Sequence, residues 1–308
     1  MRSHRTASNV FFYVLIFVSI FFIIQTCKVK NPVEPPLDCP DMVDGETSKF
    51  VDFEASWSPD GNFLVYRHIP VSDSDTYGLH VLDTVTKSVK YLSVAGIGAH
   101  TPDWSPDGNW IVFGNSGQIY KIKPNGDSLV QLTFGGENFF PEWSPDGNRI
   151  VYDRIDSIWM MDADGSNKRG GIVRGRHPSF SPDGSKILYV GYVVEGPQIF
   201  VADTSGSGVT QLTSLAGGGN TGSPSFSPTG NKIVFEHQIP GEGADTWIIN
   251  ADGMNLIRLT TDGGYFPSWS PDGSKILYTN PCPNNGYLWI MNPDGSNKKQ
   301  ITFESFYK

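Results

Sequence analysis

Short runs of alternating apolar and polar residues follow one another along most of the chain, separated by glycine, proline, aspartate and asparagine. Runs such as Ile111-Val112-Phe113, Ile150-Val151-Tyr152 and Ile276-Leu277-Tyr278 are rich in β-branched and aromatic residues, which predicts β-strands. No stretch beyond the N-terminal leader shows the spacing of an amphipathic helix. The pattern therefore predicts an all-β fold.

One sequence unit occurs six times. An aromatic residue followed by Ser-Pro-Asp-Gly begins at Trp57, Trp104, Trp143, Phe180 and Trp269, and a sixth copy at Phe226 has Thr229 in place of the aspartate. Successive copies lie 47, 39, 37, 46 and 43 residues apart, and periods near 40 are typical of solenoids and propellers. Each unit has room for four antiparallel strands, the last being short, as at Gln131-Leu132-Thr133. We therefore predict a six-bladed β-propeller of four-stranded antiparallel blades over residues 45–308.

The repeated motif has a local physical explanation. Proline fixes φ at the first corner of a type I turn, and glycine takes the left-handed position that follows, which gives a tight hairpin. Thr229 should be tolerated in this turn. We expect the six aromatic residues to pack between blades.

The first residues have the features of an export signal. Arg2, His4 and Arg5 precede an apolar run over residues 10–24, which predicts a signal peptide over residues 1–26. The run is short for a permanent membrane helix, which remains the alternative. Residues 24–27 resemble a bacterial lipobox, so we expect Cys27 to carry a lipid, with simple secretion as a further alternative. Residues 27–44 would then form a proline-rich tether.

Composition narrows the classes of partner. The 308 residues carry a net charge of -9, which argues against a nucleic-acid surface because such surfaces are basic. Three cysteines cannot supply a disulfide framework. Cys39 lies just before the first blade and Cys282 lies in the second loop of the last blade, so in an oxidising compartment they could form one disulfide that closes the ring. Two free or separately buried thiols are the alternative.

The repeats resemble the TolB-type, WD-like propeller over about 260 residues, although the Trp-Asp dipeptide of ordinary WD repeats is absent. The resemblance implies a propeller of the bacterial envelope that binds partners at one mouth of its channel. TolB proteins carry an additional N-terminal domain, for which we expect no room between Cys27 and Trp57. The same repeats occur beside the hydrolase domain of prolyl-oligopeptidase-like enzymes, but no Gly-x-Ser-x-Gly motif is found here.

Strand direction predicts two different faces. The Ser-Pro-Asp-Gly turns and the Asp-Gly-Ser-Asn turns should share one face, and the other loops, among them residues 191–197, should share the opposite one. Because the opposite face differs from blade to blade, we expect it to bind a partner. The candidate residues are Glu54, Arg67, His68, His100, Arg154, Arg176, His177, Glu236 and His237. The turns lack the glutamate at the twelfth position that a calcium loop requires.

Two functions compete at this stage. The first is a non-enzymatic scaffold that holds an envelope protein or peptide at one mouth of the propeller, as a monomer on a lipid anchor at the periplasmic side of the outer membrane. The second is a metal-assisted enzyme on acidic sugars, similar to oligogalacturonate lyase. His177 with His237, or His68 with His100, could supply two ligands, but no short ligand spacing enforces a site. We therefore predict no metal and no cofactor. Convergence of three such side chains would favour the enzyme, and dispersal would favour the scaffold.

Overall fold

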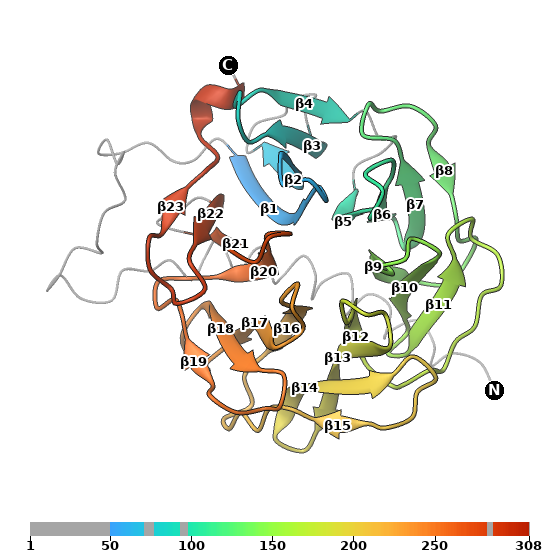
Figure 1. The fold of residues 1–308 in the computed structure, drawn as a ribbon, viewed down its shortest axis with the longest axis vertical. Helices are drawn as coiled ribbons and strands as arrows, with labels where there is room; N and C mark the ends of the chain where they lie inside the picture. The colour runs from blue at the N-terminus through green and yellow to red at the C-terminus, as the bar shows by residue number, and fades with distance from the viewer. Residues whose placement is uncertain (1–49, 71–76, 93–97, 282–285, 308) are drawn as a thin grey trace, which may run out of the picture.

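The computed structural model describes residues 50–70, 77–92, 98–281 and 286–307. Its strands form six antiparallel sheets that surround a common axis like the blades of a propeller (Figure 1). Each sheet comes from one continuous part of the chain, in the order of the sequence. The predicted six-bladed propeller is confirmed.

Blade 1 comprises β1 (Phe50–Trp57), β2 (Phe63–Pro70), β3 (Gly78–Asp83) and β4 (Val89–Leu92). Blade 2 comprises β5 (His100–Trp104), β6 (Ile111–Asn115), β7 (Gln118–Ile122) and β8 (Val130–Gln131). Blade 3 comprises β9 (Asn138–Trp143), β10 (Arg149–Arg154) and β11 (Ile158–Asp162). Blade 4 comprises β12 (Arg176–Phe180), β13 (Lys186–Val193), β14 (Gly196–Asp203) and β15 (Thr210–Gln211). Blade 5 comprises β16 (Thr221–Phe226), β17 (Lys232–Gln238), β18 (Ala244–Asn250) and β19 (Ile257–Arg258). Blade 6 comprises β20 (Tyr265–Trp269), β21 (Ile276–Asn280), β22 (Tyr287–Met291) and β23 (Lys299–Gln300). A short 3-10 helix, η2 (Glu304–Tyr307), follows.

Blade 3 departs from the four-stranded prediction. Only isolated bridges, Ser157 with Arg174 and Met160 with Arg169, stand where the other blades have a fourth strand. Gly171 adopts a φ of 70° in this segment, and a side chain on Gly170 would collide with the Trp159 ring. These two glycines interrupt the ladder, which explains why a regular strand does not form.

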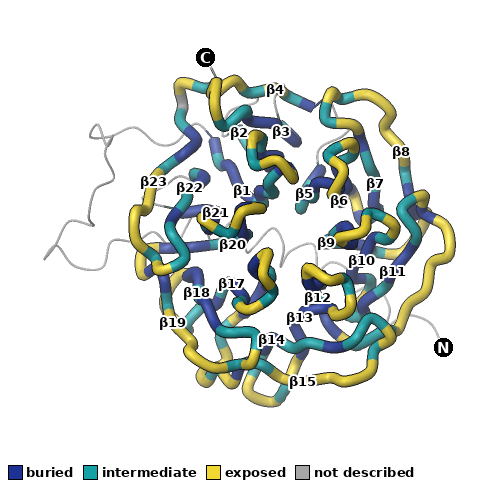
Figure 2. The backbone as a smooth tube through the Cα atoms, viewed as in Figure 1, coloured by how far each residue is buried: buried dark blue, intermediate teal, exposed yellow. Residues whose placement is uncertain are grey.

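The core lies between the blades. Six buried apolar clusters are present, and each joins two neighbouring blades. Trp104 of blade 2, for example, packs with Val65 and Leu79 of blade 1. The predicted role of the motif aromatics is confirmed. Figure 2 shows the same layering, with buried backbone in the middle strands and exposed backbone in the turns and outermost strands.

The Ser-Pro-Asp-Gly turns have the predicted geometry. Their glycines adopt φ values between 69° and 73°. In the first turn, Ser58 Oγ donates to Asp60 Oδ1 at 2.6 Å and accepts from the Phe63 amide at 2.9 Å. In the variant copy, Thr229 Oγ1 donates to Asn231 Oδ1 at 2.7 Å, and the turn keeps its backbone bond from the Gly230 amide. Thr229 is therefore accommodated, as predicted.

A polar network explains the Gln-Leu-Thr triplets. The hydroxyl of Thr133 accepts from the Ile119 amide and donates to Gln118, while Gln131 donates to the Thr133 carbonyl. Blade 4 repeats these contacts with Gln198, Gln211 and Thr213. The triplet thus binds the fourth strand and its following loop to the start of the third strand.

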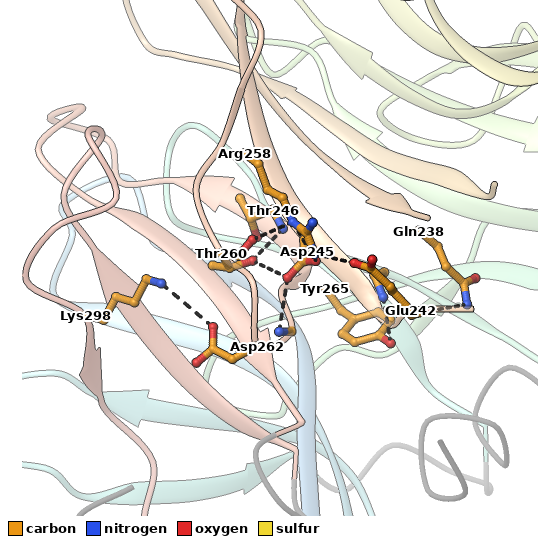
Figure 3. Close-up of polar contacts among 11 residues, drawn as sticks. Gln238, Glu242, Asp245, Thr246, Arg258, Thr260, Asp262, Tyr265 and Lys298 are labelled. Atoms are coloured by element: carbon orange, nitrogen blue, oxygen red, sulfur yellow. Dashed lines mark hydrogen bonds and ion pairs between the residues drawn. The ribbon is translucent and has the colours of Figure 1, made fainter. Parts of the chain in front are cut away.

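Blade 5 carries a charged version of this network (Figure 3). Asp245 and Arg258 replace the two glutamines, and Arg258 Nε donates to Asp245 Oδ2 at 3.1 Å. Asp245 also accepts from Thr260 Oγ1 at 2.9 Å and from the Gly263 amide at 3.1 Å. The aspartate side chain is only 4% exposed, so its charge depends on these partners.

The ring closes by packing between blades 6 and 1. Leu277 and Leu288 of blade 6 pack with Leu64 and Tyr66 of blade 1, and Phe306 of η2 packs against the same cluster. The Asp52 amide of β1 donates to the Gly286 carbonyl at 2.7 Å. Figure 1 shows η2 at the outer rim beside β4. The first and last blades are therefore joined by contacts from both ends of the described chain.

Candidate functional site

The innermost strands carry one irregular residue in each blade. Every strand pair at this position shows a shift in register. The residue concerned has a φ between 45° and 55°, and the six residues are Glu54, Thr101, Phe140, His177, Ser223 and Phe266. We call these six the inner ring. A left-handed backbone conformation is unfavourable for residues other than glycine, so contacts with the surrounding structure must stabilise it at these six positions.

Those contacts come from the preceding blade. The Thr101 amide donates to Glu54 Oε2 at 2.9 Å, and the Phe266 amide donates to Glu236 Oε2 at 2.8 Å. The His177 amide donates to Asp153 Oδ2 at 3.1 Å. Carboxylates near the axis therefore connect neighbouring blades, so Glu54 and Glu236 have a structural role that the sequence did not reveal.

Burial dominates the electrostatics of this ring. It raises the pKa values of Asp153 and Glu236 to about 7, because a charged carboxylate loses its hydration there. Burial also raises the pKa of Glu54, although Arg67 opposes this shift. Arg67 Nη1 lies 3.8 Å from Glu54 Oε2, and its Nη2 donates to the Tyr77 hydroxyl at 2.6 Å. Arg67 is itself only 8% exposed.

Sequence reasoning missed two carboxylates of this kind. Asp103 accepts from the Trp143 amide at 2.9 Å and from Ser56 at 3.0 Å, and so connects three blades. Glu142 accepts from the Phe180 amide at 2.8 Å. Burial raises the pKa of Asp103 to about 6, and burial together with the Asp103 carboxylate raises that of Glu142 well above its usual value. The sequence does distinguish these two carboxylates. Each stands directly before the motif aromatic, at a position that is serine in the other four blades.

Two predicted residues lie inside the blades. His68 is 2% exposed, and its Nδ1 lies 2.7 Å from Asp52 Oδ1. His237 is 4% exposed, and its Nδ1 lies 2.9 Å from the Thr221 hydroxyl. Both are predicted on the partner-binding face, and burial leaves little of either side chain exposed there.

The other two predicted histidines lie near the axis in different blades. His100 stacks on Phe139 at a ring separation of 5.8 Å, and His177 stacks on Phe140 at 3.8 Å. His177 Nδ1 accepts from the Ser223 amide at 3.1 Å. Burial lowers the pKa values of both to about 3. The residue of blade 2 that corresponds to His177 is Thr101, not the neighbouring His100.

The histidines do not converge. Within the described residues, no group of three or more His, Cys, Asp or Glu side chains is placed to hold a metal ion. His68, His177 and His237 each have another partner through Nδ1. The convergence of three such side chains, which would be the sign of a metal site, is not seen among the described residues.

The other two predicted arginines, Arg154 and Arg176, lie beside the hairpin between β10 and β11. The Arg154 guanidinium lies over the Trp159 ring at 4.7 Å. Arg176 Nε donates to Asp156 Oδ1 at 2.5 Å. The next hairpin was expected to be a loop over residues 191–197, but β13 and β14 continue into it, with Val193 paired to Gly196. These hairpins lie on what we call the loop face, and the Ser-Pro-Asp-Gly turns lie on the opposite turn face.

Several sequence predictions fall outside the described residues: the signal peptide over 1–26, the lipid site at Cys27, the tether over 27–44 and the disulfide between Cys39 and Cys282. They stay predictions. In the part of the chain that the structure describes, no helix has the length and apolar character needed to span a bilayer.

Comparisons with known proteins agree with this architecture. A TolB protein from Agrobacterium tumefaciens aligns with a TM-score of 0.65 and 23% identity, over 72% of this chain and 87% of that one. TolB from Acinetobacter baumannii aligns with a TM-score of 0.66 and 22% identity, over 84% of this chain and 65% of that one. This chain thus spans just under two thirds of the Acinetobacter protein.

An oligogalacturonate lyase in complex with manganese also aligns, with a TM-score of 0.53 and 14% identity, over 84% of this chain and 92% of that one. At such identities the likeness concerns the fold. The sequence model described as TolB beta propeller domain matches residues 153–308, just over half of the chain. The chain therefore belongs to the TolB β-propeller domain family.

Proposed function

We propose that the protein is a non-enzymatic binding scaffold of the bacterial cell envelope, which holds a protein or peptide on its loop face around the propeller axis. The observation that carries this proposal is the contrast between the two faces. The turn face repeats nearly the same motif six times, whereas the six positions of the inner ring hold five different residue types and the hairpins of the loop face also vary between blades. A surface of varied, preorganised groups is suited to recognition.

The export predicted from the sequence is consistent with the same proposal. The N-terminal apolar run and the lipobox-like Cys27 would place the propeller in the periplasm, tethered to the outer membrane. A propeller on a tether of about 20 residues could reach partners near the membrane surface.

Affinity purification from native envelopes tests the proposal. Tagged full-length protein is recovered after mild cross-linking beside two matched double variants. The loop-face variant combines Ile155→Ser with Tyr192→Ser, and the turn-face control combines Val85→Ser with Val209→Ser. All four side chains are more than half exposed, so neither variant should disturb folding.

We expect a protein in stoichiometric amount with the wild type and the turn-face control, and its loss from the loop-face variant. Equal recovery from all three proteins would contradict the assignment of the face. Manganese-dependent cleavage of oligogalacturonate by the purified protein, detected as unsaturated products, would instead support the enzyme.

A further inference from the structure

A pocket lies on the loop face between the hairpins of blades 3 and 4. Its volume is about 550 Å³, and it is lined by Asp156, Arg174, Arg176 and Tyr192. Asp156 lies in the turn between β10 and β11, and Tyr192 lies on β13. The two arginines lie where the chain passes from one blade to the next, so the pocket has walls from both blades.

The two arginines have different surroundings. Asp156 fixes Arg176 by accepting from Nε at 2.5 Å and contacting Nη2, and the guanidinium lies 6.0 Å from the centre of the Tyr192 ring. Arg174 is exposed, and its side chain makes no ion pair within the described residues. The lining thus contains one carboxylate and two guanidinium groups, which gives it a net positive charge.

Exposed apolar side chains surround this charge. Ile155 is 71% exposed, Tyr192 is 56% exposed and Val194 is 100% exposed. They lie on the same two hairpins that enclose the pocket. Arginine combined with exposed aromatic and aliphatic side chains is typical of surfaces that bind proteins.

We propose that this pocket binds a carboxylate of a partner peptide, either an acidic side chain or a free C-terminus, while aliphatic residues of the peptide pack on Ile155 and Val194. The inference rests on the proposed function, since it assigns the chemistry of the partner on the same face. Arginine pairs with a carboxylate through two parallel hydrogen bonds. Because the whole chain has a net charge of -9, a local positive site would orient an acidic peptide that the rest of the surface repels.

The pocket favours a peptide over an acidic sugar. Two of the exposed apolar side chains around it, Ile155 and Val194, are branched and aliphatic and suit the side chains of a peptide, whereas Tyr192 offers a ring face to either ligand. A peptide carries both the carboxylate and the apolar side chains that this surface can bury.

Binding of the purified full-length protein to a peptide array tests this inference. The array holds several hundred hexapeptides in three matched sets with the same aliphatic residues. One set carries a glutamate side chain and an amidated C-terminus, the second a glutamine and a free C-terminus, and the third neither carboxylate. Oligogalacturonates are spotted beside them. We expect binding to be enriched in one of the first two sets, which also identifies the source of the carboxylate.

Two variants test whether the enriched peptides bind at the pocket. Arg174→Gln should weaken the binding of the enriched peptides about tenfold, as expected for the loss of a charge-assisted hydrogen bond. Lys186→Gln removes an equal charge from the turn face, where Lys186 pairs with Asp203, and should change nothing. Since Arg174 is exposed and unpaired, its replacement should leave the unfolding temperature unchanged, so a failure to fold would not be confused with lost binding.

Three results would overturn the inference: equal binding to all peptide sets, unchanged binding by Arg174→Gln, or stronger binding to oligogalacturonate than to any peptide. None of these results decides the proposed function. A partner recovered from native envelopes would still support the scaffold, and its absence would leave a peptide-binding pocket without a natural partner.

Discussion

At the scale of single residues, the repeated turn shows which parts of a motif are interchangeable. The Asp60 carboxylate accepts hydrogen bonds from the Ser58 hydroxyl and from the Asn62 side-chain amide, so one carboxylate fixes both ends of the turn. Thr229 and Asn231 form a smaller set of contacts in the variant copy, without a charged acceptor. Hydrogen bonds to charged groups are stronger than those between neutral groups.

Thr229→Asp should therefore stabilise the protein. The new carboxylate can accept from Ser227 and Asn231 as its counterparts do, and the unfolding temperature should rise by about 1–3 °C. Differential scanning calorimetry measures this. The reverse exchange, Asp146→Thr, is the matched control and should lower the unfolding temperature. A decrease with Thr229→Asp would show that the variant turn has a different optimum.

A second prediction concerns how the buried carboxyl groups make the free energy of unfolding depend on pH. The pKa values of Asp103, at about 6, and of Asp153 and Glu236, at about 7, exceed the values near 4 of an unfolded chain. Between about pH 4 and 7 these three carboxyl groups bind more protons in the folded protein than in the unfolded chain, so their contribution to the free energy of unfolding falls as pH rises through this window.

The turn aspartates act in the opposite sense. Hydrogen bonds from neighbouring serines lower the pKa values of Asp183 and Asp272 to about 2. The stability that they contribute is present above about pH 4 and is lost as pH falls through their folded pKa. The buried His100 and His177 also destabilise the folded protein as pH falls below about 6.5, because their pKa values are lowered to about 3. A comparison with Asp153→Asn isolates the carboxyl contribution: the unfolding temperature of the variant should rise relative to that of the wild type from pH 5 to 8. A difference that does not change with pH would contradict this assignment.

At the scale of secondary-structure elements, the sequence predicted the blades because each one repeats the same local chemistry. The alternating strands, the turn geometry and the packing of the aromatics all followed from short motifs. The irregular fourth strand of blade 3 did not, because it depends on the left-handed backbone of Gly171 and on the close approach of Gly170 to the Trp159 ring of the neighbouring strand.

The candidate site was less predictable for a similar reason. Glu54, Glu236 and Asp153 bind backbone amides of neighbouring blades, and such contacts depend on the blade angle rather than on a motif. His68 and His237 follow hydrophobic runs and could equally have been exposed strand ends. The pocket beside Arg176 required two hairpins from different blades, which no single repeat could indicate.

A third prediction concerns how much the charged network of blade 5 contributes to the free energy of unfolding. Asp245→Ala should cost about 3 kcal/mol in the free energy of unfolding, because it removes three hydrogen-bond partners and leaves Arg258 without its buried counter-ion. The double variant Asp245→Gln with Arg258→Gln reproduces the pairs of blades 2 and 4 and should recover most of this loss. Urea unfolding measures both. A double variant as unstable as the single one would show that the networks are not equivalent.

At the scale of the whole molecule, the six contacts between blades are not equal. In five of them, the glycine of one turn lies against the proline of the preceding turn, so that a methyl group on the glycine would come within 3.6–4.0 Å of it. Gly61 has no such neighbour among the described residues. A pocket of about 450 Å³, lined partly by Trp57, Gly61 and Pro271, lies at this junction of blades 6 and 1.

Packing at the outer rim should compensate for this looser junction. Phe306→Ala removes a ring from the cluster between blades 6 and 1 and should cost about 1–3 kcal/mol. Phe134→Ala is the control, because Phe134 is 79% exposed and its loss should change stability by less than about 0.5 kcal/mol. Equal losses in urea unfolding would show that the C-terminal segment does not help to close the ring.

Site-specific photo-cross-linking in native envelopes tests the central claim most directly. A photoreactive residue is placed at Tyr192 on the loop face or at Val85 on the turn face, both of which are exposed. We predict one discrete cross-linked species from position 192 and none from position 85. Cross-linking from position 85 alone, or from neither position, would contradict a scaffold that holds its partner on the loop face.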